Sequence, residues 1–295
     1  AEEWVKKTDP SNMWLVDFMC HDFSARGLDP MSQYLIGLGH ATSFKGSDTL
    51  PVIPAARYFY GVKEDEMPIY SVNASEHSVS TTKIFTVGEQ QMIADWLKIF
   101  PKGILSIVAD TFDLWKLITE YLPANKEAIM ARDGKLVIRP DSGDPVDIIC
   151  GEIYPKRTSE EEDEYLKSGQ WRKEGSPTPF HPKYKGVIEL LWDIFGGTEV
   201  QGSDGKMYKV LDPHIGAIYG DSITPERQAK IYERLAAKGF AATNIVLGVG
   251  SFTYQHNTRD TLGFAAKGAW FEVNKIISGG KFTNATSSIK KSYNI

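Results

Sequence analysis

The stretch KLVIRPDSGDP, residues 135–145, runs from three aliphatic residues directly into groups that can do chemistry. Arg139, Asp141 and Ser142 offer a guanidinium, a carboxylate and a hydroxyl between two prolines. A solvated turn is the simplest explanation, because Pro, Asp, Ser and Gly are ordinary turn residues. The alternative is that a strand ends here and presents these side chains to a ligand.

The same pattern recurs along the chain, and this recurrence favours the second explanation. Other apolar segments also end in polar, aromatic or glycine residues: His21, Asp22, Phe23 and Arg26; Lys45 and Asp48; Ser71, Glu76 and His77; Asp110 and Asp113; Gly220 and Asp221; Gly248, Gly250 and Ser251. Taken singly, each has a structural explanation. Phe23 suits a core, His77 a structural histidine, Asp110 a helix N-terminus and the glycines tight turns.

Together these residues suit one class of ligand. Guanidinium groups clamp phosphate oxygens, and glycine turns add main-chain donors. The candidate cations are Arg26, Arg139, Arg259 and Lys267. Carboxylates can accept ribose hydroxyls or hold Mg²⁺ through water, and an aromatic face such as Phe23 suits a flat ring. The chemistry indicates a phosphorylated sugar and a planar base, although neither a complete GxGxxG nor a Walker motif is present.

The elements that must position these side chains alternate between strand and helix. The apolar runs predict strands at 13–19, 104–110, 136–139, 217–221, 244–250 and 264–273, and the amphipathic segments predict helices at 30–38, 86–100, 111–122, 185–195 and 225–238. Thr86 and Glu89 are expected to form a capping box. This alternation predicts βα units around a parallel sheet. Polar turns after almost every strand favour an α/β barrel, whose strand ends meet at one mouth, over an open doubly wound sheet.

Composition limits the classes of protein. The chain has 295 residues and a formal net charge of −5, so no global basic field indicates nucleic acid. No apolar run is long enough to span a membrane, and Cys20 and Cys150 are too few for a disulfide scaffold, so a cytoplasmic protein is expected. We expect one catalytic barrel domain over 1–273, with a polar insertion at 151–184, and a flexible polar tail over 274–295.

The motifs that end these segments resemble those of a known enzyme family. HDFSARG, FKGSDT, YSVNASEHS, IRPDSGDP, YGDSI and GVGS…NTRD, in this order, are similar to the motifs of nicotinamide phosphoribosyltransferases over residues 14 to 273. The resemblance implies an irregular, TIM-like parallel β/α barrel of the type II phosphoribosyltransferases. It also implies a homodimer with active sites at the interface. The implied reaction converts nicotinamide and phosphoribosyl pyrophosphate to nicotinamide mononucleotide and pyrophosphate, with Mg²⁺ and with ATP as a coupled co-substrate.

The resemblance also implies roles for single residues. Phe23 would stack on the pyridine ring, Arg139 would border it, and Asp48 would accept from the carboxamide. Ser71 is a further expected substrate-binding residue. His77 would be phosphorylated from ATP and oriented by Asp110, while Asp141 would bind ribose hydroxyls. The resemblance implies that Arg26, Arg259 and Lys267 bind phosphate. It also implies that the ribose-phosphate end is lined by Gly220, Asp221, Gly250 and Ser251.

Two alternatives to this reading stay open. A nicotinate phosphoribosyltransferase would differ at the base, where Asp48 favours the amide because it would repel a carboxylate. A non-catalytic fragment is the other alternative, because family members are longer and carry an aromatic residue N-terminal to this region that completes the ring sandwich in the neighbouring subunit. Ser251 also replaces a glycine that relatives often keep.

Overall fold

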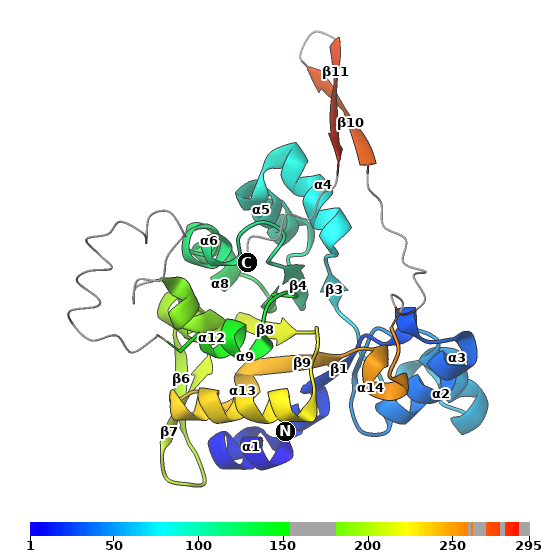
Figure 1. Cartoon of the computed structure of the whole chain (residues 1–295), viewed down its shortest axis with the longest axis vertical. Coiled ribbons are helices and arrows are strands. Elements are labelled where there is room, and N and C mark those ends of the chain that lie inside the picture. Colours follow the sequence, from blue (N-terminus) through cyan, green and yellow to red (C-terminus); the bar gives the residue numbers. More distant parts are fainter. Residues whose placement is uncertain (154–180, 259–260, 262–269, 278–280, 289–295) are drawn as a thin grey trace, which may run out of the picture.

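The computed structural model describes residues 1–153, 181–258, 261, 270–277 and 281–288, and it is built around a curled parallel sheet (Figure 1). Seven strands form this sheet in the order β2-β1-β9-β8-β5-β4-β3, and every pairing within it is parallel. The strands are β1 (Cys20–Asp22), β2 (Gly46–Ser47), β3 (Asn73–Ala74), β4 (Leu105–Val108), β5 (Leu136–Arg139), β8 (Ile215–Tyr219) and β9 (Ile245–Val249).

The order of the strands gives the sheet a barrel-like form. Read as a ring, the spatial order follows the chain, and the last strand, β9, pairs with the first, β1, through Cys20–Leu247. The two edges of the sheet also approach each other. Gly46 of β2 forms a parallel bridge with Tyr70, three residues before β3, and Ser47 N–H donates to the Tyr70 carbonyl at 3.0 Å. The predicted α/β fold with a parallel, barrel-like sheet is therefore confirmed.

Burial explains the continuous apolar runs of the central strands. All four residues of β4 and all five of β8 are buried. Ile107, Ile138 and Ile215 on three neighbouring strands belong to one hydrophobic core. Parallel strands that are buried on both faces have no solvent-facing side, so they need no polar alternation.

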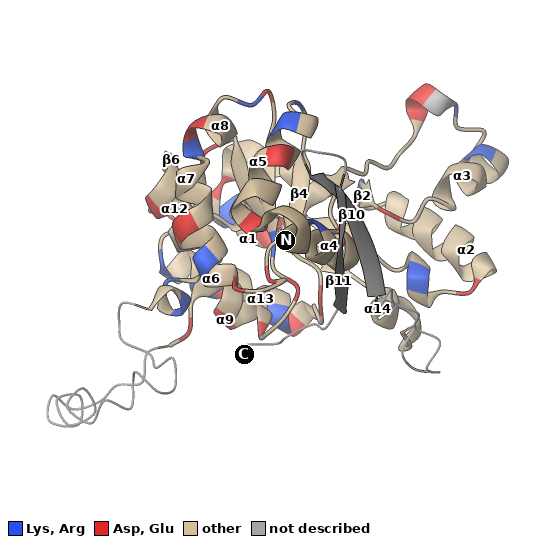
Figure 2. Cartoon of the chain, turned by 90° about the horizontal axis from the view of Figure 1, so that it is seen from above, with Lys and Arg blue, Asp and Glu red and all other residues tan. Residues whose placement is uncertain are grey.

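Helices flank the sheet, and most of them lie between successive strands in the chain (Figure 1). They are α1 (Glu2–Thr8), α2 (Pro30–Ala41), α3 (Val52–Tyr60), α4 (His77–Val87), α5 (Glu89–Ile99), α6 (Leu114–Lys116), α7 (Leu122–Ala124), α8 (Lys126–Met130), α9 (Pro145–Cys150), α12 (Gly186–Phe195), α13 (Pro225–Ala237) and α14 (Ser251–Gln255). A π-helical turn, η4 (Leu117–Tyr121), joins α6 to α7. Figure 2 shows basic and acidic residues interspersed along these flanking helices. Of the described helices, none has the length and apolarity needed to cross a membrane.

The strand predicted at residues 13–19 is wrong. This segment lies in a 3₁₀ helix, η1 (Pro10–Phe18), and the first strand starts at Cys20. Pro10 opens the helix, and Trp14 within it is 62% exposed. A short apolar run cannot be assigned to strand or helix by hydrophobicity alone, and here the segment packs beside the sheet instead of within it.

The start of the helix predicted at 86–100 is also corrected. Its apolar face is confirmed, because Met92, Ile93, Trp96 and Leu97 are buried. The capping box is wrong, because the N-cap of α5 is Gly88, which has a φ of 82° and follows α4 directly. Thr86 lies in the last turn of α4, where its hydroxyl donates to the Lys83 carbonyl. A glycine with positive φ separates the two helices, and this takes Thr86 away from the capping position.

Two antiparallel strand pairs lie in segments for which the sequence predicted other structure. β6 (Gly197–Gln201) and β7 (Met207–Leu211) form a hairpin that was not predicted. β10 (Trp270–Ile277) overlaps the strand predicted at 264–273, and it pairs with β11 (Lys281–Ser288) inside the segment predicted to be a loose tail. A run rich in Ser, Thr and Asn carries little strand signal of its own, so only its pairing with β10 makes it a strand.

Most of the predicted insertion lies outside the described residues. The described ends of this segment meet, because the Glu152 N–H donates to the Lys183 carbonyl at 2.9 Å. Gly151 and Gly186 pack so closely that a Cβ on Gly186 would lie 2.2 Å from the Gly151 nitrogen. The ends of the segment are therefore joined at one place beside α9 and α12.

Candidate active site

The carboxyl ends of the parallel strands bring most of the candidate residues together. Main-chain hydrogen bonds fix the turns that follow: Phe23 N–H donates to the Val249 carbonyl at 2.8 Å, and Asp48 N–H donates to the Asp22 carbonyl at 2.9 Å. Ser75 N–H, just after β3, donates to Ser106 of β4 in the same way. The sheet thus places residues that are far apart in sequence at one mouth, the arrangement known from β/α barrels.

His77 lies between two carboxylates in this mouth. Its Nε2 is 3.1 Å from Oδ1 of Asp110, and its Nδ1 is 3.7 Å from Oδ2 of Asp141. His77 is the first residue of α4, and Asp110 and Asp141 follow β4 and β5. Oδ2 of Asp110 accepts from the Ser142 hydroxyl and, at 3.1 Å, from the Asp141 N–H. Asp110 is thereby fixed on one side while it holds the imidazole on the other.

The two carboxylates differ in their electrostatic environment. Burial raises the pKa of Asp110, but the hydrogen bonds from His77 and Ser142 outweigh it, so this pKa is lowered. Burial also raises the pKa of Asp141, and the charges of Asp110 and Asp221 add to this effect against those of Arg139 and His77. The pKa of Asp141 is therefore raised, and its carboxyl takes up a proton more easily than that of Asp110.

Asp48 is the centre of a second polar group, at the ends of β1 and β2. Its Oδ1 accepts from the Ser71 hydroxyl at 2.6 Å and lies 3.1 Å from Nε2 of His21. Burial raises the pKa of Asp48, but the hydrogen bonds from His21 and Ser71 and the charge of Arg139 lower it, and the net change is downward. The Asp48 side chain is 38% exposed, so an ionised acceptor is available at the mouth.

Phe23 lies beside this second group and packs against two glycines. Its ring centroid is 4.7 Å from that of His21. A Cβ on Gly220 would lie 2.8 Å from the Phe23 ring, and a Cβ on Gly248 would lie 2.3 Å from it. The ends of β8 and β9 therefore need residues without side chains at these positions to leave room for the aromatic ring. This contact explains why residue 220 is a glycine, in addition to the tight turn predicted from the sequence.

Arg139 connects the two polar groups. Its Nη2 donates to the Ser75 carbonyl at 2.6 Å, and its Nε is buried with no hydrogen bond to any described residue. Its positive charge contributes to the lowered pKa of Asp48 and opposes the rise in the pKa of Asp141. The strand-end arginine of the opening motif is therefore the cation shared by both groups, and the solvated-turn explanation does not hold for it.

The other predicted positions are less closely tied to the two groups. Asp221 is exposed and accepts from the Ser222 hydroxyl at 3.0 Å, and Arg26 is exposed in the 3₁₀ turn η2 (Ala25–Gly27). Ser251 is buried, and its hydroxyl donates to the Asn257 carbonyl at 2.8 Å, next to Gly250. Arg259 and Lys267 lie outside the described residues.

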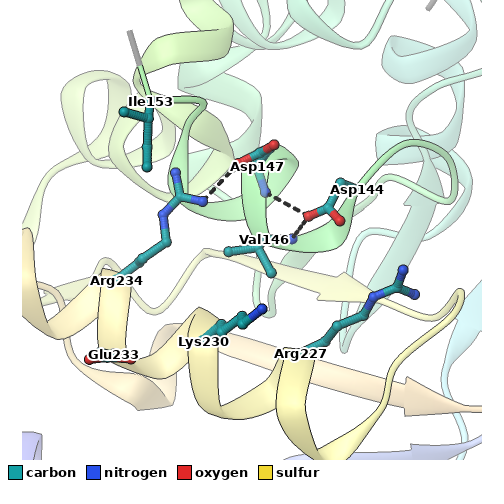
Figure 3. A pocket seen from close by; sticks show the side chains of 8 residues that line it. All are labelled: Asp144, Val146, Asp147, Ile153, Arg227, Lys230, Glu233 and Arg234. Atoms are coloured by element: carbon teal, nitrogen blue, oxygen red, sulfur yellow. Dashed lines mark hydrogen bonds and ion pairs between the residues drawn. The ribbon is translucent and has the colours of Figure 1, made fainter. Parts of the chain in front are cut away.

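A pocket lies between α9 and α13 (Figure 3). Its lining comes from α9, α13 and Ile153: Asp144, Val146, Asp147, Ile153, Arg227, Lys230, Glu233 and Arg234. Its charges are mixed, and Arg234 Nη1 is paired with Asp147 Oδ1 at 2.7 Å. None of these residues belongs to the predicted site, and the candidate site is therefore kept at the two polar groups of the mouth.

The part of the chain that the structure describes holds no group of three or more His, Cys, Asp or Glu side chains that could bind a metal ion. Carboxylates such as Asp141 and Asp221 fit Mg²⁺ in another way. This ion retains several waters and is commonly held by one or two carboxylates together with substrate phosphates.

Sequence reasoning missed three residues of this site. It named His21 and Ser142 at strand ends without giving them a role, and it did not consider Ser75. The Ser75 hydroxyl accepts from the Val108 N–H at 2.9 Å while its carbonyl holds Arg139. Position after a strand is the signal that indicated His21 and Ser142, but only contacts between strands show what they hold.

This arrangement has a definite chemical capacity. An aromatic ring beside an ionised acceptor can bind a flat ring that carries an N–H donor. An imidazole held by a carboxylate can accept or transfer a proton or a phosphoryl group, and a shared guanidinium can bind an anion.

Comparisons with known proteins agree with this chemistry. Residues 18–292 match the sequence profile described as the nicotinate phosphoribosyltransferase (NAPRTase) family. A nicotinamide phosphoribosyltransferase of Acinetobacter baylyi is 39% identical over 269 residues, which cover 87% of this chain and 46% of the relative. Proteins with the same name from Mycoplasma pneumoniae and Xanthomonas campestris are 36% and 31% identical, over 93% of this chain. The chain spans about half the length of these curated relatives.

Proposed function

Since this chain belongs to the nicotinate phosphoribosyltransferase family, we propose that it transfers a phosphoribosyl group from phosphoribosyl pyrophosphate to nicotinamide. A bond forms between the pyridine nitrogen and the anomeric carbon of the ribose, while the bond from that carbon to the pyrophosphate oxygen breaks. The products are nicotinamide mononucleotide and pyrophosphate.

The observation that carries the choice of base is the ionised Asp48 beside the ring of Phe23. Phe23 stacks on the pyridine ring, and Asp48 accepts from the carboxamide N–H. A nicotinate carboxylate offers no such donor and is repelled by the Asp48 charge. Nicotinate is therefore the second candidate substrate, despite the description of the family, and the names of the curated relatives support the amide.

At the other polar group, His77 accepts a phosphoryl group from ATP. Asp110 holds Nε2 of His77, which leaves Nδ1, on the side of Asp141, as the nitrogen with the free electron pair. The bond between the γ-phosphorus of ATP and its bridging oxygen breaks as the bond to this nitrogen forms, and ADP leaves. Hydrolysis of the phosphohistidine then couples ATP to product formation.

The remaining residues act on the sugar and the leaving group. Arg139 borders the base, Asp141 binds the ribose hydroxyls, and Gly220, Asp221, Gly250 and Ser251 line the ribose-phosphate end. Arg26, Arg259 and Lys267 are the proposed phosphate ligands. Mg²⁺ held by Asp141 and Asp221 would neutralise the departing pyrophosphate. Positive groups stabilise this displacement because charge builds up on the leaving oxygens.

The finer assignments belong to the same proposal. The barrel-like sheet corresponds to the TIM-like fold of type II phosphoribosyltransferases, and the protein acts in the cytoplasm as a homodimer with its site at the interface. A partner subunit would then add groups to the mouth that this chain does not supply. The alternative is a non-catalytic fragment. Such a chain would bind the same ligands but would need another chain to catalyse the reaction.

The experiment that tests this function measures nicotinamide mononucleotide formed from nicotinamide, phosphoribosyl pyrophosphate, Mg²⁺ and ATP, with nicotinate in a parallel reaction. We expect nicotinamide to be used in preference, and Asp48→Ala and His77→Ala to lower the rate. Calorimetric titration with phosphoribosyl pyrophosphate identifies a chain that binds without turnover. A chain that binds neither phosphoribosyl pyrophosphate nor nicotinamide would contradict the proposal.

A further inference from the structure

His21 contacts both residues to which the proposed function assigns the base. It is the middle residue of β1, and its side chain is 11% exposed. Its Nε2 lies 3.1 Å from Oδ1 of Asp48, and its ring lies 4.7 Å from that of Phe23, at an interplanar angle of 38°. One nearly buried imidazole therefore touches the acceptor and the aromatic ring together.

The hydrogen bonds of Asp48 are unevenly divided between its two oxygens. Oδ1 receives both His21 Nε2 and the Ser71 hydroxyl, at 3.1 and 2.6 Å. Both hydrogen bonds between the Asp48 carboxylate and described residues therefore end on Oδ1, and none ends on Oδ2. A carboxylate oxygen has two lone-pair sites, so two internal donors occupy Oδ1 and leave Oδ2 as the acceptor for a ligand.

The backbone beside His21 fixes the position of its ring. His21 pairs with Gly46 of β2, and a Cβ on Gly46 would lie 2.7 Å from Nδ1 of His21. The Gly46 carbonyl accepts from Nε2 of His40 at 2.9 Å, and Nδ1 of His40 lies 2.8 Å from the Tyr254 hydroxyl. The hydrogen bond from His40 thus fixes the main chain at Gly46. A side chain at this position would collide with the His21 ring, so glycine is needed for Nε2 of His21 to reach Asp48.

We propose that His21 is a positioning residue that determines the choice of base: by donating from Nε2 to Oδ1 it holds the Asp48 carboxylate so that Oδ2 faces a carboxamide. This inference rests on the proposed function. It deepens that function by assigning the preference for an amide over an acid to a pair of residues instead of to Asp48 alone.

The physical reason is the protonation state of Asp48. Burial favours its neutral form, and the hydrogen bond from His21 is the foremost effect that lowers its pKa again. Without His21, Asp48 takes up a proton more easily. A protonated carboxyl can donate to a nicotinate carboxylate and no longer repels it, so the preference for nicotinamide falls.

Three variants of His21 separate the donor from the ring. Gln carries an amide nitrogen near the position of Nε2, Phe keeps an aromatic ring without a donor, and Asn places its amide near Nδ1, out of reach of Asp48. We expect His21→Phe and His21→Asn to lower the ratio of kcat/KM for nicotinamide over nicotinate by about 10- to 100-fold, the range for a hydrogen bond to a charged group. The KM for nicotinamide rises, whereas that for phosphoribosyl pyrophosphate stays unchanged.

Rescue by the conservative variant distinguishes positioning from a merely structural role. His21→Gln should retain most of the wild-type preference, and His21→Asn serves where His21→Phe fails to fold. An unchanged preference in both His21→Asn and His21→Phe overturns the inference about His21 alone, as does equal loss in all three variants. A wild-type chain that neither binds nor converts nicotinamide overturns the proposed function itself.

A second measurement is independent of turnover. Long-range ¹H–¹⁵N spectra of the ligand-free chain report which ring nitrogen carries the proton, and the signal missing in His21→Gln identifies His21 among the six histidines. We expect a proton on Nε2 of His21 that exchanges faster with solvent in Asp48→Ala. A neutral ring protonated on Nδ1 alone overturns the inference, because such a ring cannot donate to Asp48.

Discussion

Nε2 of His77 lies 3.1 Å from Oδ1 of Asp110, a carboxylate whose side chain is only 7% exposed. The other oxygen of Asp110 accepts from two donors that follow β5, the Ser142 hydroxyl and the Asp141 N–H. The position of the His77 imidazole therefore depends on residues that follow β3, β4 and β5. This relationship makes Asp110 the residue through which the sheet orients His77.

Asp110→Asn should reduce phosphorylation of His77 by about 10- to 100-fold, because a hydrogen bond to a charged group is worth about 1.5–3 kcal/mol. Both oxygens of Asp110 accept hydrogen bonds, so the NH₂ group of the variant would face a donor, either the Ser142 hydroxyl or Nε2 of His77. Transfer of labelled phosphate from ATP to the protein measures this step directly. Asp113→Asn is the matched control, since Asp113 caps α6 by accepting from the Lys116 N–H and Asn is an equally good cap. Equal loss in both variants would contradict the role of Asp110.

Arg139→Ala should impair use of nicotinamide more than it impairs folding. The variant loses the charge that helps to keep Asp48 and Asp141 ionised, and we expect kcat/KM to fall about 100-fold, the effect of roughly 3 kcal/mol. Arg132 is a suitable comparison, because it is buried and donates to the carbonyls of Phe100 and Gly103, outside the site.

Arg132→Ala should therefore lower the free energy of unfolding without a comparable change in KM. Urea denaturation and steady-state kinetics on both variants separate the two effects. If Arg139→Ala lost stability and activity in the same proportion as Arg132→Ala, Arg139 would be a structural residue.

Gly248→Ala should move the ring of Phe23, since the new Cβ would lie 2.3 Å from it. Overpacking of this kind costs about 1–3 kcal/mol of stability. Aromatic stacking contributes about 0.5–1.5 kcal/mol, so we expect the KM for nicotinamide to rise up to roughly tenfold. Gly39→Ala is the control, because a Cβ there meets nothing within 4 Å. Kinetics and thermal unfolding check the prediction, and an unchanged KM in a folded Gly248→Ala chain would contradict it.

Glu89 should make the stability of the protein depend on pH. It is 9% exposed, its Oε1 has no hydrogen-bond partner among the described residues, and burial, with the charge of Asp113, raises its pKa from 4.5 to about 7 against the effect of Lys116. Between these values the folded chain binds more protons than the unfolded chain, so stability falls as pH rises from about 4.5 to about 7.

Glu89→Gln removes this dependence. The variant should match the wild type near pH 4.5 and be the more stable at pH 8, by at most about 3.5 kcal/mol at about 1.4 kcal/mol per pKa unit. Urea denaturation at both pH values measures the difference. Glu199→Gln, at an exposed position of β6, should show no such difference. If Glu89→Gln and the wild type differed in stability by the same amount at pH 8 as at pH 5, burial of the ionised Glu89 would not be the cause.

The sequence by itself determined the class of fold and the kind of residue at each strand end. Apolar runs such as 104–110 and 136–139 predicted buried parallel strands, because a strand covered on both faces needs no polar alternation. The polar turns after them predicted a common mouth, because parallel strands point the same way. Both inferences depend on local composition and direction, which the order of residues contains.

Only the tertiary structure decided which of these residues touch. His21 and Asp48 are 27 positions apart, and His77 and Asp110 are 33 apart, so no local pattern pairs them. The segment at 13–19 and the strand β11 show the same limit, because neighbours outside the segment decided whether an apolar or a polar run became a helix or a strand. Contacts between strands depend on register and packing across the whole sheet, and these properties emerge only when the chain folds.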